Sequence, residues 1–239
     1  MNLTPEIIAA VEAHAAREYP NEACGVVTTR GVYVPLVNVA EDKANGFRLQ
    51  ADTFMLYDVA AVFHSHPDGR DAPTASDMQS QIATAVPWAL CVSYKDGTTS
   101  KPFMWGGDYI PPLLGRQYRH GPSGTDDRGD CYAVIRDWYL TERGIKLPEF
   151  PRDDEWWKNG GDLYINGFAE AGFAEVSVEK EPQIGDCALM AINSKGVINH
   201  AAVYVGEGMI LQQLCQRISR REPACRWMKK IERWVRYVA

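Results

Sequence analysis

The sequence predicts an α+β protein of two domains, residues 1–108 and 109–239. Apolar residues recur at helical spacing between residues 4 and 19 and again around 134–139. Each of these stretches is followed by short β-like runs bounded by turn residues. Residues 106–129 are rich in glycine and proline, which is typical of turns and linkers, so the boundary is expected there. The two halves do not repeat each other, which indicates a fusion rather than a duplication.

The individual elements follow from local patterns. In the first half we expect a helix capped by Thr4 and ending near Tyr19 and Pro20, strands over 25–29 and 32–39, a short helix over 53–60, a strand over 61–63 that leads into His64, a helix from Thr74 or Ser76, and strands over 88–94 and 102–105. In the second half we expect a helix through 134–139 and strands over 186–192 and 197–205.

Composition excludes several classes of protein. The net charge of the 239-residue chain is -6, so electrostatics alone predict no nucleic-acid binding. Six scattered cysteines without C-x-x-C spacing argue against a zinc ribbon or a disulfide framework and favour a reduced, cytosolic chain. The amino terminus lacks the pattern of a signal peptide. Because no apolar run approaches about 18 residues, we expect no membrane span.

Charge is unevenly distributed along the chain. Residues 216–239 carry eight basic and two acidic side chains, so the remainder of the chain is strongly acidic. A charge run is most often a solvated face. The alternative is a docking edge for an acidic partner, and the sequence leaves both interpretations open.

The first chemical motif is a histidine pair, His64 and His66. Residues two apart on an extended segment face the same side, so both imidazoles can converge on one ion. Asp77, expected at the start of a helix, can close back as a carboxylate ligand. Two histidines and one carboxylate leave a fourth position of tetrahedral zinc open for water, whose pKa zinc lowers to about 7. Glu22, after the first helix, is a candidate general base; taken alone, the histidine pair could also be a polar loop.

The complete pattern of Glu22, His64-Ser65-His66-Pro67 and 73–77 resembles the signature of the JAMM metalloproteases. The resemblance covers roughly residues 1–105 and implies an α/β-type fold with a mixed sheet flanked by helices. It implies Zn²⁺ bound by His64, His66 and Asp77, with Glu22 as the base. Thr74 stands where the family carries a serine that helps hold the oxyanion. Threonine keeps the hydroxyl but adds a methyl group, so Thr74 is a departure from the pattern.

The second chemical motif is Asp130-Cys131 at the start of the second helix. If Asp130 caps that helix, Cys131 lies in the first turn, where the helix N-terminus is expected to favour the thiolate and lower the thiol pKa. His200 is the remaining histidine with a suitable context, since His14 belongs to the other half and His120 to the linker. A lone helical cysteine is more often a buried small hydrophobe, which is the competing interpretation.

The order Asp130-Cys131, Gly185-Asp186, His200 to Gly206 and Gln212 resembles the NlpC-type cell-wall peptidases, from about residue 109 to the C-terminus. The resemblance implies a papain-like α+β domain that cleaves peptidoglycan stem peptides. Cys131 would be the nucleophile, His200 the base and Gln212 the third residue, where many relatives have histidine. The adjacent Gln213 could compete for that role.

The pairing of these two halves resembles the tail-tip assembly proteins of lambda-like bacteriophages. That resemblance implies peptidase activity used in tail assembly or in cell-wall penetration during DNA injection. It also implies phage tail-tip proteins as partners, peptidoglycan peptides as substrate, and a location in the host cytoplasm during assembly or at the virion tail tip. The main alternative is a structural tail component that keeps two inactive enzyme folds for binding. A deubiquitinase-like role is a weaker alternative, because the second half points to the cell wall.

Overall fold

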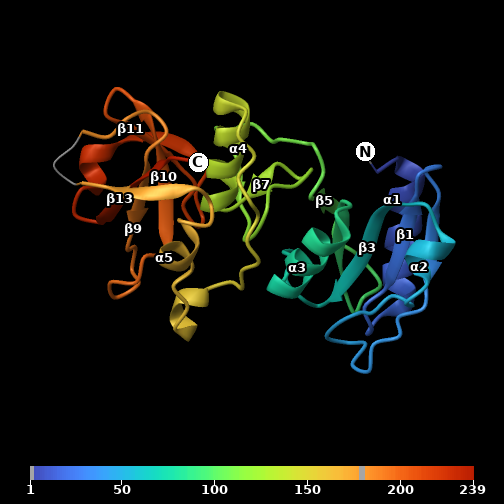
Figure 1. Cartoon of the computed structure of the whole chain (residues 1–239). Helices are drawn as coiled ribbons and strands as arrows, with labels where there is room; N and C mark the ends of the chain where they lie inside the picture. Colours follow the sequence, from blue (N-terminus) through green and yellow to red (C-terminus); the bar gives the residue numbers. More distant parts are fainter. Residues whose placement is uncertain (1–2, 178–180) are drawn as a thin grey trace. The chain divides into compact units, whose positions relative to one another are not determined.

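The computed structural model describes residues 3–177 and 181–239, and it divides into two compact units (Figure 1). The first unit contains residues 1–109 and 124–126, and the second unit contains 110–123 and 127–239. Residues 124–126 join the first unit because Gly124 bridges Trp105 and the Thr125 amide donates to the Met104 carbonyl at 2.9 Å. Both units combine helices with a sheet, so the predicted α+β class is confirmed.

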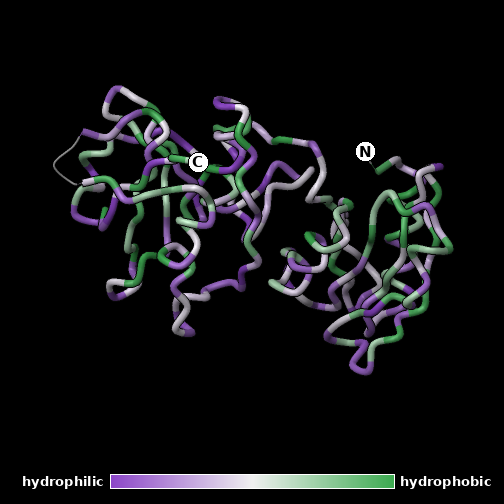
Figure 2. The backbone as a smooth tube through the Cα atoms, in the orientation of Figure 1, coloured by the Kyte–Doolittle hydropathy of each residue, from purple (hydrophilic) through white to green (hydrophobic). Residues whose placement is uncertain are grey.

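The first unit is a five-stranded mixed sheet of order β2-β1-β3-β4-β5, in which only the β3–β4 pair is parallel. Its elements are α1 (Pro5–Glu18), β1 (Cys24–Thr28), β2 (Tyr33–Leu36), α2 (Thr53–Leu56), β3 (Val59–Pro67), α3 (Ala75–Thr84), β4 (Trp88–Ser93) and β5 (Phe103–Trp105). A parallel pair needs a crossover, which α3 supplies between β3 and β4. The loop between β2 and α2 has a hydrophilic tip (Figure 2).

Helix α1 covers one face of this sheet. Thr4 caps it, accepting from the Ile7 amide, and Pro5 occupies its first turn. The buried stripe that includes Ile7, Val11 and Ala15 packs against alternate residues of the central strands. The opposite face has its own apolar cluster, with Trp88 and Trp105 as its largest members.

The helix predicted over 53–60 is wrong beyond Leu56. Strand β3 already begins at Val59, where Val59 pairs with Thr28 of β1. The strand then continues to Pro67 and carries His64 and His66 within it, rather than ending before them. Pairing with β1 and β4 on both sides outweighs the weak local preference that suggested a helix.

The second unit holds a six-stranded sheet of order β12-β11-β10-β9-β13-β8. Its elements are β6 (Gln117–Tyr118), β7 (Arg128–Gly129), α4 (Cys131–Arg143), η1 (Trp156–Asn159), α5 (Leu163–Gly167), β8 (Phe173–Val176), β9 (Cys187–Met190), β10 (His200–Gly206), β11 (Met209–Gln212), β12 (Arg220–Pro223), η2 (Ala224–Trp227) and β13 (Ile231–Tyr237). Apolar residues of α4, such as Val134 and Trp138, share one core cluster with Ala201 and Val203 of β10.

Part of the segment expected as a linker belongs to the second unit. Residues 110–123 contain β6, which pairs with β7 just before α4. Arg116 is 2% exposed and donates to Asp137 of α4 at 2.7 Å and to the carbonyls of Pro111 and Pro112. Arg116 therefore links residues 110–123 to helix α4, which begins at Cys131.

Asp137→Ala is expected to lower the unfolding free energy of the second unit by about 3–5 kcal/mol, because it leaves the Arg116 guanidinium buried and unpaired. Urea unfolding of the full chain, followed by tryptophan fluorescence, measures the effect. The double variant Arg116→Met with Asp137→Leu removes both charges and should lose much less. Equal losses in the two variants would contradict this account.

The basic run near the C-terminus forms part of β12, η2 and β13. Some of its charges are paired within the second unit: Arg236 binds Asp186 through two contacts of 2.7 Å, and Arg233 binds Glu175 at 2.6 Å. Arg226 and Lys229 are exposed. Both sequence interpretations, a solvated face and a docking edge, therefore stay open for the remaining charges. Among the described residues, none of the helices is long and apolar enough to cross a bilayer.

Candidate functional sites

The first candidate site is set by β3, whose side chains alternate between the two faces of the sheet. Ala61 and Phe63 pack toward α1, whereas Val62 joins the cluster on the opposite face. His64 and His66 lie two and four residues after Val62 on the same strand, so both imidazoles lie on the face opposite α1.

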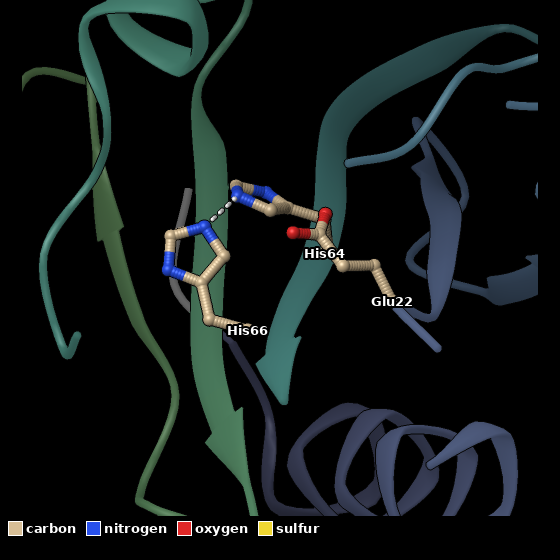
Figure 3. A group of neighbouring side chains, drawn as sticks. All are labelled: Glu22, His64 and His66. Carbon is tan, nitrogen blue, oxygen red and sulfur yellow. Dashed lines mark hydrogen bonds between the residues drawn. The ribbon is translucent and has the colours of Figure 1, made fainter. Parts of the chain in front are cut away.

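Glu22 reaches the same place through its neighbour Ala23. The Ala23 amide donates to Ser65 Oγ at 2.9 Å, and the Ser65 amide donates to the Ala23 carbonyl at 3.0 Å. Figure 3 shows the Glu22 carboxylate and the two imidazoles turned toward one another. One ligand atom from each of Glu22, His64 and His66 lies within 4.8 Å of the others. The structure therefore brings the base candidate to the histidine pair.

Asp77 closes the group from the start of α3. Its Oδ1 lies 3.4 Å from His64 Nε2, its Oδ2 lies 3.4 Å from His66 Nε2, and the two Nε2 atoms are 3.2 Å apart. Although burial favours the neutral acid, the two imidazoles hold the pKa of Asp77 well below its usual range. Asp77 is therefore an anion facing both histidines.

The Thr74 hydroxyl is committed to the N-terminus of α3. It accepts from the Asp77 amide at 3.1 Å, which is one half of a capping box, and it donates to Asp77 Oδ2 at 2.7 Å. The Thr74 amide donates to the same oxygen at 2.7 Å. Thr74 thus orients the Asp77 carboxylate, and the oxyanion role implied for it would require its hydroxyl to leave Asp77.

This donor set fits a zinc ion. Tetrahedral ligands at about 2.0–2.2 Å from zinc lie about 3.4 Å from one another, which matches the separations of 3.2 and 3.4 Å among His64, His66 and Asp77. His66 Nδ1 is 2.9 Å from the Arg70 carbonyl, which leaves its Nε2 lone pair facing the group. Burial raises the pKa of Glu22 to about 7, with His66 opposing and Asp77 adding to the shift. A carboxyl group of that pKa can exchange protons near neutrality.

The second candidate site begins at Cys131, the first residue of α4. Asp130 caps this helix as expected, accepting from the Ala133 amide at 2.9 Å. The Asp130 carboxylate also pairs with Arg152 at 2.6 Å. Although burial favours the neutral acid, Arg152 holds the pKa of Asp130 below its usual range. Cys131 therefore directly follows an ionised carboxylate that is paired with Arg152.

His200, the first residue of β10, is held by Gln212 of β11. His200 Nε2 lies 3.0 Å from Gln212 Oε1, and Gln212 Nε2 donates to Glu222 of β12 at 2.5 Å. Because the carboxylate can only accept, it turns the Gln212 oxygen toward His200, so His200 Nε2 carries the hydrogen and Nδ1 keeps its lone pair. Gln213 instead donates to the Leu214 carbonyl at 3.2 Å and to the Arg217 carbonyl, away from the ring.

A cavity of about 550 Å³ joins these residues. Cys131 and His200 both line it, together with aromatic side chains that include Trp156, Trp157 and Tyr164. A volume of this size accommodates a ligand of a few residues, within the range of about 300–1,000 Å³ for such pockets. His120, expected in the linker, also lines the cavity, and its Nε2 lies 2.9 Å from the Arg152 carbonyl.

The expected lowering of the Cys131 pKa by the helix N-terminus is wrong for this resting structure. Burial, followed by the charge of Asp130, raises the pKa of the Cys131 thiol to about 11. Burial also lowers the pKa of His200 to about 4, against the opposing hydrogen bond to Gln212. Both groups are therefore neutral at pH 7, because desolvation outweighs the helix terminus.

Comparison with protein families assigns a class to each unit. The NlpC/P60 family matches residues 115–236, and the family of prokaryotic homologs of the JAB domain matches residues 4–105. The chain therefore combines a JAB-like domain with an NlpC/P60 hydrolase-type domain that follows it.

Two relatives align with most of this chain. Tail tip assembly protein K of Escherichia phage lambda is 36% identical over 174 residues, which cover 73% of this chain and 78% of that protein. Tail tip assembly protein K of Escherichia phage N15 is 31% identical over 240 residues, covering 96% and 93%. The chain belongs to the family of tail tip assembly protein K. A crystal structure of an NlpC/P60 family protein from Bacillus cereus matches with a TM-score of 0.38 and 16% identity, over 94% of this chain and 66% of that one.

Several residues that contact the two sites were not predicted from the sequence. Ser65 lies between the histidines and binds Ala23, and Phe47 stacks on His64 with ring centroids 4.7 Å apart. Glu222 orients Gln212, and the Tyr164 hydroxyl contacts the Cys131 sulfur. Each contact joins segments far apart in the sequence, and only the middle position of the H-S-H motif could have drawn attention to Ser65.

Proposed function

We propose that this protein is a peptide-bond hydrolase of the phage tail tip, whose cysteine site cleaves peptidoglycan stem peptides. The observation that carries the proposal is the cavity lined by both Cys131 and His200, with Gln212 fixing the imidazole. An imidazole with a fixed tautomer that lines the same cavity as a thiol supplies the base and the nucleophile that cysteine peptidases need. The functional division is proposed at residues 1–108 and 109–239.

The chemistry follows from the two neutral groups. As Cys131 Sγ attacks the scissile carbonyl carbon, its proton passes to His200 Nδ1 and the carbonyl electron pair moves onto oxygen. Gln212 Oε1 accepts from Nε2–H and stabilises the imidazolium that forms. His200 then protonates the leaving amine as the C–N bond breaks, and a thioester remains. Water attacks this thioester with His200 as base, which releases the acid and restores the thiol.

For the first unit we propose Zn²⁺ binding by His64, His66 and Asp77, and hydrolysis of a peptide or isopeptide bond. When bound, zinc supplies Lewis-acid polarisation and makes a water molecule more acidic. Glu22 would serve as the proton acceptor at this site, for which a pKa of about 7 is suitable. Thr74 holds the Asp77 carboxylate in place.

The proposed setting comes from the relatives, which are named tail tip assembly proteins. The partners would be phage tail-tip proteins, met in the host cytoplasm during assembly or at the tail tip of the virion. Hydrolysis would serve tail assembly, cell-wall penetration during DNA injection, or both.

The test is product identification by mass spectrometry after purified peptidoglycan is incubated with the full-length protein. We expect muropeptides with new termini within the stem peptide. Intact stem peptides, together with binding of the protein to the sacculi, would support the structural alternative, in which both enzyme folds serve only for binding.

Glu222→Gln is expected to lower kcat on a stem peptide by about tenfold or more with little change in KM. Without the carboxylate, the Gln212 amide loses its fixed orientation, and His200 then loses its fixed tautomer. In the wild type the acid limb of kcat/KM should lie near pH 4, since the buried His200 is neutral, and hence a base, above that pH. Arg221→Gln, an exposed change on the same strand, is the matched control. Unchanged kcat in Glu222→Gln would exclude a positioning role.

A further inference from the structure

Tyr164 of α5 places its hydroxyl on the sulfur of Cys131. The Oη–Sγ distance is 3.1 Å, and Tyr164 lines the same cavity as Cys131. The ring of Tyr164 lies against Trp156, with centroids 6.2 Å apart. The contact therefore brings the segment after α4 onto the N-terminus of α4.

The direction of this hydrogen bond follows from the acidities of the two groups. Burial raises the pKa of Cys131 to about 11, and burial together with the nearby Cys131 raises the pKa of Tyr164 well above its usual value. The hydrogen bond itself lowers the pKa of Cys131 and raises that of Tyr164, so Tyr164 keeps its proton beside a Cys131 thiolate, and a thiolate can only accept. When the sulfur is charged, the Tyr164 O–H is the donor.

The other groups around the Cys131 sulfur do not fully stabilise a thiolate. Asp130 disfavours the thiolate and Arg152, its partner, partly compensates, while the Ala201 backbone provides one hydrogen bond to the sulfur. Tyr118 and His200 line the cavity as neutral groups. A thiolate removed from water is costly unless donors replace its hydration.

We propose that Tyr164 is a further catalytic residue, whose hydroxyl donates to the Cys131 sulfur and stabilises the negative charge that develops on it. The inference rests on the proposed function of Cys131 as nucleophile. Tyr164 keeps its proton throughout: the thiol proton passes to His200, the S–C bond forms, and the carbonyl electron pair moves onto oxygen. The hydrogen bond is strongest while the sulfur carries charge and weakens once that bond has formed.

Tyr164→Phe tests this inference through the reactivity of the thiol itself. The full-length protein is treated with iodoacetamide between pH 6.5 and 10, and modification of Cys131 is followed by mass spectrometry. We expect a higher apparent pKa for Cys131 and a rate at pH 8 that is about three- to tenfold lower. Each unit of pKa costs tenfold in thiolate, which the greater nucleophilicity of a more basic sulfur partly offsets. The exposed Cys225, which does not line the cavity, is an internal reference whose rate should not change.

Tyr132→Phe is the matched control. The Tyr132 hydroxyl donates to the Pro148 carbonyl at 2.7 Å, so its loss loosens the same region without removing a contact to the sulfur. Slower alkylation in Tyr164→Phe alone supports the inference, whereas equal or faster alkylation overturns it and indicates a covering role. Peptidoglycan hydrolysis by Cys131→Ala is measured in parallel. Retained hydrolysis there would refute the nucleophile, independently of the alkylation result.

Discussion

Cys131→Ala is expected to reduce stem-peptide hydrolysis by about 10⁴-fold or more. The methyl group cannot form the S–C bond, so the acyl-enzyme route closes, and the loss of a catalytic nucleophile typically has effects of this size. The substitution is small and Asp130 still caps α4, so the fold should persist. Initial rates on a defined stem peptide, with the thermal unfolding midpoint measured beside them, check both expectations.

A control variant and a chelator separate the cysteine site from other sources of hydrolysis. Cys225→Ala removes an exposed cysteine that does not line the cavity, so it should retain full activity. A chelator should leave hydrolysis at the cysteine site unchanged, since that route uses only Cys131, His200 and their neighbours. Hydrolysis by Cys131→Ala at the wild-type rate would mean that the cleavage arises elsewhere.

The double variant His64→Ala with His66→Ala is expected to lose zinc completely, whereas the wild type should bind one zinc ion per chain. The variant removes two of the three proposed ligand residues, whose contacts with one another are 3.2–3.4 Å, and Asp77 alone cannot hold the ion. Elemental analysis after equilibration with zinc and gel filtration gives the stoichiometry without any assay of activity.

Zinc should also stabilise the first unit. An ion at 100 times its Kd that binds only the folded state adds about 2.7 kcal/mol to the unfolding free energy. The thermal midpoint of the wild type should therefore rise with zinc, and that of the double variant should not. His120→Ala, which alters a histidine of the second unit, is the control. Zinc retained by the double variant would refute these ligands.

The parts of both sites that were predictable are those fixed by local periodicity. Alternation along a strand predicts that His64 and His66 share a face, and the helix-start pattern predicts that Asp130 precedes the first turn at Cys131. Both arrangements are present. The grouping of Asp77 with the histidines was predicted from the motif. Local periodicity alone does not show that the chain turns back and brings Asp77 to them.

The parts that were not predictable depend on contacts between distant segments. Strands β8 and β13 were not predicted, because β8 has only four residues and β13 acquires its place by pairing with β9 and β8, which are both distant in the sequence. The Cys131 pKa was misjudged, because burial depends on how the later segment containing Tyr164 packs over the helix N-terminus. A sequence pattern reports which groups are present, but desolvation is a property of the whole cavity.

The position of β13 has a consequence for biosynthesis. This strand, the last that the structure describes, lies between β9 and β8, and among the described residues β8 pairs with β13 alone. The sheet that supports His200 therefore cannot close until the ribosome has delivered residues up to about Tyr237, whereas the first unit is complete by residue 126. Because domains fold as units during synthesis, the two units are expected to mature at different times. The thiol reaches its finished cavity only when nearly all of the polypeptide has been made.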